Sequence, residues 1–431
     1  MEAKVDFIPL RNLSMRITKG TTPTRGEGFV SRGINYVKSE AITPNGTIDT
    51  SKFAQIDEAT HKALARSQLS VGNVLFSMAG VYLGKTAVVK PEHLPANTNQ
   101  AVGIIAIDEA KADPRFIHYS IQAPSCRSWI MNSAAQSAQP NFNLKEIGDL
   151  PIPHFELEEQ RAIAHALGTL DDKIELNRHR NQTLEAMARA LFKDWFIDFG
   201  PVRAKMEGQQ PYLPADLWQL FPDRLDDEGK PEGWEMQPLD EIADFLNGLA
   251  LQKFPATDPD DSLPVIKIAE LRNGVSAKSD RASREVPTKY IVNDGDFLFS
   301  WSGSLLAKFW TEGEGALNQH LFKVTSEHYP MWFVAHWVHH HLEEFQAIAA
   351  SKATTMGHIQ RGHLKAAVTL CPPDDVMERL GVVMAPLVEQ AIHNELESRH
   401  LAQLRDTLLP KLISGELRIA DADKFMESVT L

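Results

Sequence analysis

The chain has 431 residues, of which 43% are hydrophobic and 23% charged, a composition typical of a globular protein long enough for two or more domains. Its two cysteines, Cys126 and Cys371, are too few for a disulfide framework or a four-cysteine metal site. The first ten residues are of mixed charge, and no apolar run approaches the roughly 20 residues that cross a bilayer. We therefore expect a soluble, cytoplasmic protein.

The formal net charge of -13 argues at first against a nucleic-acid binder, because affinity for phosphate comes from Lys and Arg. The acidic residues are concentrated, however. Residues 216–261 hold thirteen Asp or Glu against three Lys or Arg, whereas 1–150 hold sixteen basic against thirteen acidic residues, and 263–370 hold eleven against ten. The globular parts are thus close to neutral, which leaves DNA binding open.

In chain order, the first 150 residues or so predict short strands, because runs such as 73–76 and 102–107 are alternating or β-branched and are bounded by Gly, Pro and Asn. From Ile163 the apolar positions step by four and three along a predicted long helix, with two Asn near the middle. After the acidic stretch the strand pattern returns. A second helical stripe then begins at Leu380, with Pro386 as a potential kink.

The order of short motifs in the first half recurs in the second, at a spacing of about 220 residues. Residues 72–77 (GNVLFS) return as 295–300 (GDFLFS), 99–100 as 318–319, and 144–145 as 364–365. We predict an α+β chain with a pseudo-twofold internal repeat, in which two mixed, mostly β domains are joined by two long helices.

Two separated helical stripes predict an antiparallel coiled coil whose Asn residues set the register, and about 35 residues would span roughly 50 Å. The alternative is that each helix covers only its own domain. The residues expected at this helix interface, or in contact with a partner there, are Ile163, Leu167, Leu170, Ile174, Asn177, Asn181, Leu184, Leu191, Leu380, Met384, Leu387, Asn394, Leu401, Leu404 and Leu408.

Three stretches of the sequence superficially resemble catalytic or metal-binding motifs, but none of them fits the motif in full. Residues 80–86 resemble a phosphate loop, but three residues separate the glycines where four are needed. The four histidines between His336 and His341 lack the accompanying Glu or Cys pattern of a metal site, and Glu228-Gly229-Lys230 lies in the acidic linker. Since nucleophile-elbow, dinucleotide-loop and methyltransferase motifs are also missing, we predict a binding protein with no catalytic or metal-ligating residues.

Several strings, in order, resemble the specificity subunits of Type I restriction-modification systems. Residues 17–23 (ITKGTTP), 36–38 (YVK) and 72–80 are similar to successive signatures of a target-recognition domain in that family. Residues 139–160 resemble its exit into a conserved helix, and 191–202 resemble the family's central conserved region. Residues 354–359 and 404–417 look like the matching end of a second copy, although 374–379 (DDVMER) replaces the usual Leu-Glu-Glu-Gln.

The resemblance implies a division into target-recognition domain 1 (1–155), a central conserved helix (156–199), a linker (200–233), target-recognition domain 2 (234–375), a C-terminal conserved helix (376–415) and a tail (416–431). Each head would read one half of a bipartite DNA site, and two methyltransferase subunits would dock on the helices, joined by motor-nuclease (restriction) subunits. The chain itself would be non-catalytic and would bind no cofactor. S-adenosylmethionine, ATP and magnesium would belong to the partner subunits.

Base edges are read by polar side chains, whereas phosphate contacts only fix position, so we expect DNA contacts from the Gly-rich loops. In the first head the expected residues are Lys19, Thr21, Arg25, Arg32, Lys38, Lys85, Gln136, Gln139 and Asn141. In the second they are Lys253, Lys267, Arg272, Trp301, Lys308, His320, Thr354, His358, Gln360 and Arg361. Trp301 stands where the first copy has Met78, so the heads are expected to read different sequences.

Two other functions remain open at this point. The chain is a duplicated protein-interaction scaffold without DNA readout if its complexes show no salt-dependent affinity for DNA. It is a fused enzyme if the isolated chain transfers methyl groups, which the missing motifs disfavour.

Overall fold

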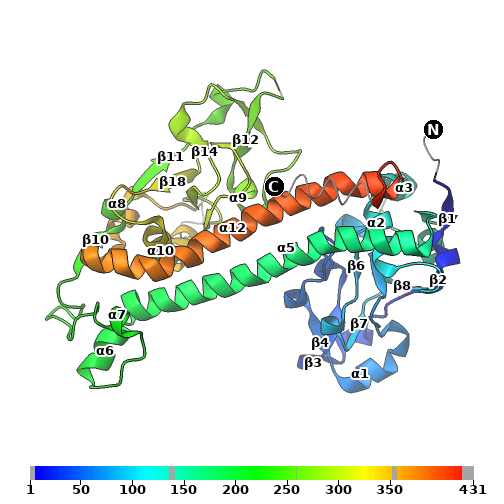
Figure 1. Ribbon diagram of the computed structural model, residues 1–431, viewed down its shortest axis with the longest axis horizontal. Helices are drawn as coiled ribbons and strands as arrows, with labels where there is room; N and C mark the ends of the chain where they lie inside the picture. Colours follow the sequence, from blue (N-terminus) through cyan, green and yellow to red (C-terminus); the bar gives the residue numbers. More distant parts are fainter. Residues whose placement is uncertain (1–4, 135–140, 259, 352–356, 420–431) are drawn as a thin grey trace. The chain divides into compact units, whose positions relative to one another are not determined.

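The computed structural model describes residues 5–134, 141–258, 260–351 and 357–419, except for the side chain of Arg25. The chain divides into two compact units, which we call unit 1 (residues 1–173 and 401–431) and unit 2 (174–400) (Figure 1). Among the described residues, no helix combines the length and the apolar character needed to cross a bilayer.

Unit 1 is built on short strands and short helices. Its strands are β1 (Phe7–Pro9), β2 (Ser14–Lys19), β3 (Phe29–Val37), β4 (Ala54–Ile56), β5 (Val74–Ser77), β6 (Thr86–Val88), β7 (Ala96–Thr98), β8 (Val102–Ile107) and β9 (Pro151–Pro153). Its short α-helices are α1 (Glu58–Ala63), α2 (Pro114–Gln122), α3 (Pro124–Ala134) and α4 (Leu144–Gly148). Buried β-branched and aromatic side chains fill the central strands, which explains why these runs form strands despite their brevity.

Unit 2 has the same kinds of elements. Its strands are β10 (Glu235–Pro238), β11 (Asp244–Asn247), β12 (Ser262–Ile266), β13 (Arg281–Ser283), β14 (Ile291–Val292), β15 (Phe297–Ser300), β16 (Ala307–Phe309), β17 (Gly315–Leu317), β18 (Leu321–Thr325) and β19 (Val368–Cys371). Its shorter α-helices are α6 (Gly200–Met206), α7 (Ala215–Trp218), α8 (Leu239–Ile242), α9 (Ile268–Asn273), α10 (Met331–Ser351) and α11 (Arg361–Ala366).

The strand orders of the two units correspond. Unit 1 has an antiparallel sheet β2-β8-β5-β6, and unit 2 has an antiparallel sheet β11-β18-β15-β16. A second sheet in each unit contains one parallel pair, β3 with β7 and β12 with β17. The first and last strands of each unit also pair, β1 with β9 and β10 with β19.

Two long helices, α5 (Leu157–Phe192) and α12 (Asp374–Ile413), contribute to both units (Figure 1). Helix α12 continues through Pro386 without interruption. It begins at Asp374 and Asp375, whose carboxylates in the first turn favour the positive end of the helix dipole. This acidic start provides the helix entry where the expected Leu-Glu-Glu-Gln is missing.

In unit 1 both long helices are part of the same core. Leu167 and Leu170 of α5 belong to one buried cluster with Leu404, Leu408 and Leu412 of α12. At its edge, the Asp171 carboxylate accepts hydrogen bonds from the Tyr119 hydroxyl and from the Arg405 guanidinium, each at 2.6 Å. An apolar cluster and a largely enclosed ion pair therefore bind three helices together.

In unit 2 the two helices meet through amides. The Asn181 Nδ2 donates to the Ala391 carbonyl, and the Asn394 Nδ2 donates to the Asn181 Oδ1, both at 2.8 Å. The Asn177 Nδ2 donates to the Glu397 carboxylate at 2.7 Å. Asn177 of α5 contacts Glu397 of α12, and the later residue Asn181 contacts the earlier residues Ala391 and Asn394. These segments of the two helices are therefore antiparallel.

The fifteen residues of the predicted helical stripes are all buried or half-buried. The buried ones are Ile163, Leu167, Leu170, Asn177, Asn181, Leu380, Met384, Asn394, Leu404 and Leu408, and the half-buried ones are Ile174, Leu184, Leu191, Leu387 and Leu401. The apolar periodicity therefore marks the faces of α5 and α12 that are shielded from solvent.

The Asp171 ion pair gives a first prediction. Asp171→Asn leaves the Arg405 guanidinium, whose side chain is only 14% exposed, with the exposed Asp406 carboxylate as its remaining partner charge, and we expect it to lower the free energy of unfolding of unit 1 by about 2 kcal/mol. Asp172→Asn, one residue away, removes an ion pair with Arg115 in which Asp172 is 49% exposed, so its loss should be under about 1 kcal/mol. Urea unfolding with hydrogen exchange in α2 measures both, and equal losses would contradict the assignment.

A buried histidine in unit 1 makes its stability depend on pH. His118 is 6% exposed and its Nδ1 lies 2.8 Å from the Thr86 hydroxyl, and burial lowers its pKa from 6.5 to about 4. The unfolded chain therefore binds this proton first, so the stabilisation is complete above pH 6.5 and is lost as the pH falls toward about 4.

We expect wild type to lose up to roughly 3 kcal/mol over this range relative to His118→Gln, which keeps a hydrogen-bonding group but does not titrate. Urea unfolding of both proteins between pH 7 and pH 4 gives the difference, in which the shared carboxylate titrations cancel. Parallel pH profiles would show that His118 is not the titrating group.

Candidate nucleic-acid interface

The loops at one end of the sheet β2-β8-β5-β6 in unit 1 are held by main-chain hydrogen bonds. The Gly20 amide donates to the Val102 carbonyl at 3.0 Å, and the Met78 amide donates to the Ala101 carbonyl at 2.9 Å. Residues Ala79 and Asn141 form an isolated bridge. The end of β2, the end of β5 and the start of β8 thus present their loops together.

Unit 2 repeats this construction at the corresponding end of β11-β18-β15-β16. The Gly248 amide donates to the Leu321 carbonyl at 3.1 Å, and the Trp301 amide donates to the His320 carbonyl at 3.3 Å. Ser302 and His358 form the isolated bridge that corresponds to Ala79 and Asn141. We call these main-chain contacts the frame. Its residues are Gly20, Met78, Ala79, Ala101, Val102 and Asn141 in unit 1, and Gly248, Trp301, Ser302, His320, Leu321 and His358 in unit 2. The main-chain contacts are therefore the same in both units, while the side chains differ.

Glycine is required at one position of each frame. A Cβ on Gly20 would lie 2.2 Å from the carbonyl oxygens of Thr98 and Asn99, and a Cβ on Gly248 would lie 2.3 Å from the Asn318 carbonyl oxygen. Asn99 and Asn318 also serve the frame, because each side-chain oxygen accepts from the amide two residues later, at 3.2 and 3.3 Å. Their repetition in the sequence thus has a structural explanation.

The side chains on the frame of unit 2 form an aromatic and imidazole cluster. The Trp301 Nε1 donates to the Asn247 Oδ1 at 2.9 Å, and its ring centroid lies 5.7 Å from that of His320 and 6.2 Å from that of His358. The His320 Nδ1 is 3.0 Å from the Ser302 hydroxyl. These bonds fix the orientation of the half-exposed Trp301 indole and His320 imidazole, and the half-exposed His358 ring lies nearly perpendicular to the indole, at 82°.

The frame of unit 1 carries smaller and more flexible groups at the equivalent places. Met78 is buried, Ala101 is half-exposed and Asn141 is exposed. Lys19 is exposed at the end of β2, and the Thr21 hydroxyl lies 3.4 Å from the Arg66 guanidinium. The two frames therefore offer different patterns of donors, acceptors and apolar surface.

Other predicted residues of unit 1 surround this end or lie along β3. The Lys85 ammonium lies 4.6 Å from the centroid of the Tyr82 ring, and burial, with some repulsion from Arg127, lowers its pKa. Lys38 follows β3 and lies 3.8 Å from the Glu40 carboxylate. Arg32 is exposed on β3. Gln136, Gln139 and Thr354 lie outside the described residues, as does the side chain of Arg25.

The remaining residues predicted for unit 2 are dispersed. Lys253 is exposed in a short 3-10 turn, Arg272 is exposed in α9, Lys308 is half-buried in β16, and Gln360 is exposed at the start of α11. Two of them have partners: the Lys267 ammonium pairs with the Asp280 carboxylate, and the Arg361 guanidinium donates to the Phe245 carbonyl at 3.3 Å. Arg361 thereby lies next to β11, which leads to the cluster.

Three polar residues of this end were not among those predicted. Asn247 and Ser302 orient Trp301 and His320, and the Gln319 amide nitrogen lies 3.4 Å from the His320 Nε2. The repetition of 99–100 as 318–319 was a usable signal for Gln319. Asn247 stands where the first copy has Lys19, and Ser302 stands where it has Ala79, so neither the amide nor the hydroxyl is repeated and only their contacts reveal them.

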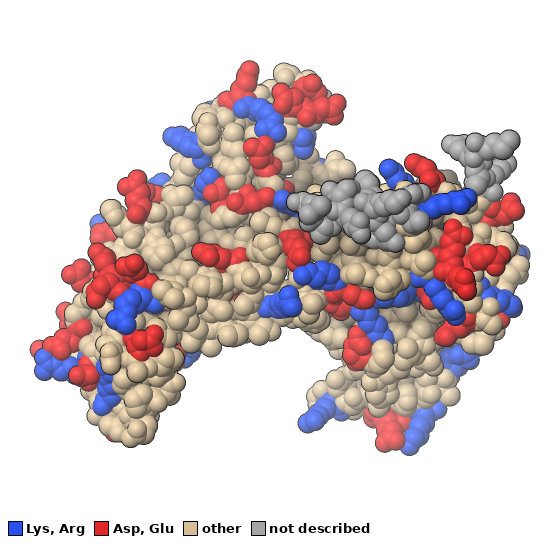
Figure 2. All heavy atoms as spheres, in the orientation of Figure 1, with Lys and Arg blue, Asp and Glu red and all other residues tan. Residues whose placement is uncertain are grey.

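The described residues hold no group of three or more His, Cys, Asp or Glu that could bind a metal ion. His336 and His341, from the histidine-rich segment, instead have main-chain partners, the Trp332 carbonyl at 2.6 Å and the Val368 carbonyl at 2.9 Å. Figure 2 shows basic and acidic side chains intermingled on the face that it draws. This mixture agrees with the near-neutral charge of the two head sequences.

Comparison with known proteins identifies the class of protein. A family model described as the Type I restriction modification DNA specificity domain matches residues 15–186 and 231–375. The chain belongs to this family, which confirms the resemblance found in the sequence, and its family role is DNA sequence specificity.

Individual relatives agree with this assignment. The chain is 26% identical over 379 residues to the Type I restriction enzyme MjaIX specificity subunit of Methanocaldococcus jannaschii, covering 84% of this chain and 82% of the relative. It is 24% identical over 327 residues to the HindI specificity subunit of Haemophilus influenzae, covering 64% and 71%. A crystal structure of a Type I restriction-modification S subunit from M. genitalium has the same fold, with a TM-score of 0.56 at 14% identity and coverage of 96% and 97%.

The glycine requirement gives a prediction for the frame. Gly248→Ala places a methyl group against the main-chain oxygen of Asn318, so we expect a loss of about 2 kcal/mol or more in the free energy of unfolding of unit 2. Gly362→Ala is the control, because nothing lies within 4 Å of the added Cβ and the residue is in helix α11. Its change should be a gain of under about 1 kcal/mol. Urea unfolding followed by tryptophan fluorescence measures both, and an unchanged Gly248→Ala would refute the requirement.

Proposed function

We propose that this chain is the non-catalytic DNA-reading subunit of a Type I restriction-modification complex, in which each unit reads one half of a bipartite site. The observation that carries the proposal is the repeated main-chain frame with different side chains. Because the frame occurs twice, each copy can contact one half-site. Unit 1 has Met78 and Ala101 where unit 2 has Trp301 and His320, so the two copies can recognise different base sequences.

We further propose that the chain is an internal duplication with pseudo-twofold symmetry, and that α5 and α12 form an antiparallel coiled coil between the two target-recognition domains. The corresponding strand orders and the opposed directions of the helix segments support this arrangement. A 36-residue helix is about 54 Å long, which is the scale of a spacer that fixes the gap between two half-sites on DNA.

In this proposal the target-recognition domains are residues 1–155 and 234–375, and the conserved helices are 156–199 and 376–415. Residues 200–233 form a linker and 416–431 a tail. We propose that two methyltransferase subunits dock on the helices and that motor-nuclease subunits join them. S-adenosylmethionine, ATP and magnesium then belong to those partners. Because this chain is acidic, DNA affinity depends on basic surface from the partners, and the isolated chain binds DNA weakly.

The test is co-expression with the methyltransferase subunit of the same system, followed by single-molecule sequencing to map methylated adenines. The expected result is a split motif with a fixed gap that disappears when this chain is omitted. A contiguous motif, or methylation independent of the chain, would favour the interaction scaffold instead.

A pair of substitutions tests the division of labour between the heads. Trp301→Met with His320→Ala gives unit 2 the side chains of unit 1, and each lost base contact should cost about 1 to 3 kcal/mol in discrimination. We expect one or two positions of one half-site to become degenerate while the other half-site is unchanged. Lys365→Ala, which alters an exposed residue of α11, should leave both half-sites intact. Relaxation of both half-sites by the double variant would contradict the proposal.

A further inference from the structure

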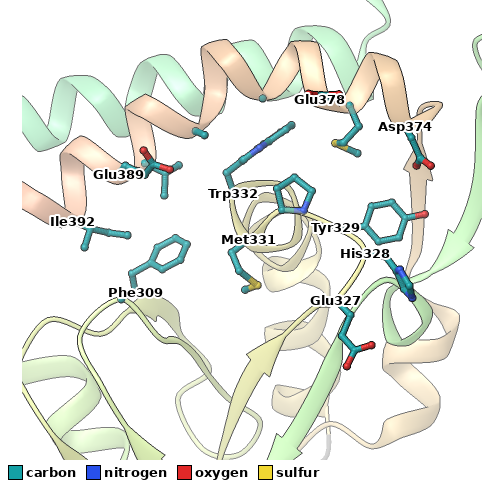
Figure 3. A pocket seen from close by; sticks show the side chains of 16 residues that line it. Phe309, Glu327, His328, Tyr329, Met331, Trp332, Asp374, Glu378, Glu389 and Ile392 are labelled. Carbon is teal, nitrogen blue, oxygen red and sulfur yellow. The ribbon is translucent and has the colours of Figure 1, made fainter.

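Unit 2 contains a groove that the DNA-reading proposal does not use. Its cavity volume is about 660 Å³, and it is lined by the loop before α10, the start of α10, the turns of α12 between Asp374 and Ile392, and by Gly295 and Phe309 (Figure 3). The 19 residues of that stretch of α12 make it about 28 Å long. The groove is therefore large enough for several side chains from one face of a helix.

The groove combines an apolar floor with an acidic rim. Met331, Trp332, Met377, Val388 and Ile392 supply apolar lining. The carboxylates that line it are Glu327, Asp374, Glu378 and Glu389, all on exposed residues. None of the four forms an ion pair with a described residue, and the lining includes neither Lys nor Arg. Among the described residues, therefore, no cationic side chain pairs with this negative charge next to the apolar surface.

The corresponding place in unit 1 holds an ion pair between its own helices. Arg115, the second residue of α2, lies over Gly168 of α5, 2.7 Å from where a Cβ would be, and donates to both oxygens of Asp172 at 2.7 and 2.8 Å. In unit 2 the second residue of α10 is Trp332, whose Nε1 lies 3.4 Å from where a Cβ on Gly381 of α12 would be.

Four residues after each of these glycines, unit 1 has Asp172 and unit 2 has Ala385. The ion pair of unit 1 is therefore replaced in unit 2 by an indole and a methyl group. The cation that neutralises this surface in unit 1 has no counterpart in the groove of unit 2.

We propose that the groove binds an amphipathic helical segment of a protein partner, with apolar side chains on one face and Lys or Arg beside them. The apolar face packs on the half-buried Val388 and Ile392, and the basic side chains pair with Glu378 and Glu389. Since the Arg115–Asp172 ion pair occupies the corresponding place in unit 1, one segment binds per chain. This surface is separate from the DNA-reading loops, but it includes residues 377–392 of the helix on which the proposed function places methyltransferase docking, so the inference rests on that part of the proposed function.

The probe is a fluorescein-labelled 18-residue helical peptide of Leu and Lys, titrated with the full-length chain and followed by fluorescence anisotropy. A second peptide with Ser in place of Leu keeps the charge but has no apolar face. We expect the Leu/Lys peptide to bind and the Ser/Lys peptide to bind at least about tenfold more weakly. Equal binding of both would show charge attraction alone and would overturn the proposal.

Two kinds of variant locate the site. Glu378→Lys with Glu389→Lys should weaken the Leu/Lys peptide at least about tenfold, whereas Asp240→Lys with Glu343→Lys, which changes net charge equally at exposed positions away from the groove, should change it less than about twofold. Trp332→Arg with Ala385→Asp copies the pair of unit 1 at unchanged net charge and should abolish binding. Equal weakening by the first two variants would place the peptide elsewhere.

The buried Trp332 variant is interpreted only if its unfolding transition matches that of wild type. The surface variants Glu378→Lys and Glu389→Lys decide the question if it does not. In each case, retention of wild-type affinity by a folded groove variant refutes the groove as the binding site.

Discussion

The burial of both long helices in each unit is the constraint on which the rest of this structure depends. In unit 1, Leu167 and Leu170 of α5 share a core with Leu404 and Leu408 of α12. In unit 2, Phe192 at the end of α5 shares a core with residues of the first turns of α12. Fully burying an aliphatic side chain contributes about 1.5 to 3 kcal/mol, so neither unit is complete without segments of both helices.

Polar groups between the helices add specificity to that burial. The Asn181–Asn394 amide pair and the Asp171–Arg405 ion pair are each satisfied only when particular turns of α5 and α12 lie opposite each other. A shift by one turn would leave a buried amide or a largely enclosed charge without its partner, which costs more than the bond itself contributes. The loops that follow β5 and β15 extend from sheets whose cores are stabilised by these contacts between the two helices.

Much of this architecture could be predicted from the sequence, because the responsible features are periodic or punctuated. The stripe from Ile163 onward marked the shielded face of α5, and the repeated Gly-Asx pairs before β5 and β15 marked the two sheets. What could not be predicted are contacts of single polar side chains. The pairing of Lys267 with Asp280 and the orientation of His320 by Ser302 follow no period, because they depend on chain segments brought together only by folding.

The last turns of α12 complete the core of unit 1, although they are synthesised long after the rest of that unit. Unit 1 takes residues up to 173 and then residues from 401 onward, more than two hundred positions later. At a synthesis rate of about 5 to 20 residues per second, the first head would wait roughly 10 to 50 s for the leucines of α12 that complete its core. During that interval the core of unit 1 lacks the side chains of α12, whereas all segments of unit 2 have been made once residue 400 is added, so unit 2 is the first to have its complete set of segments.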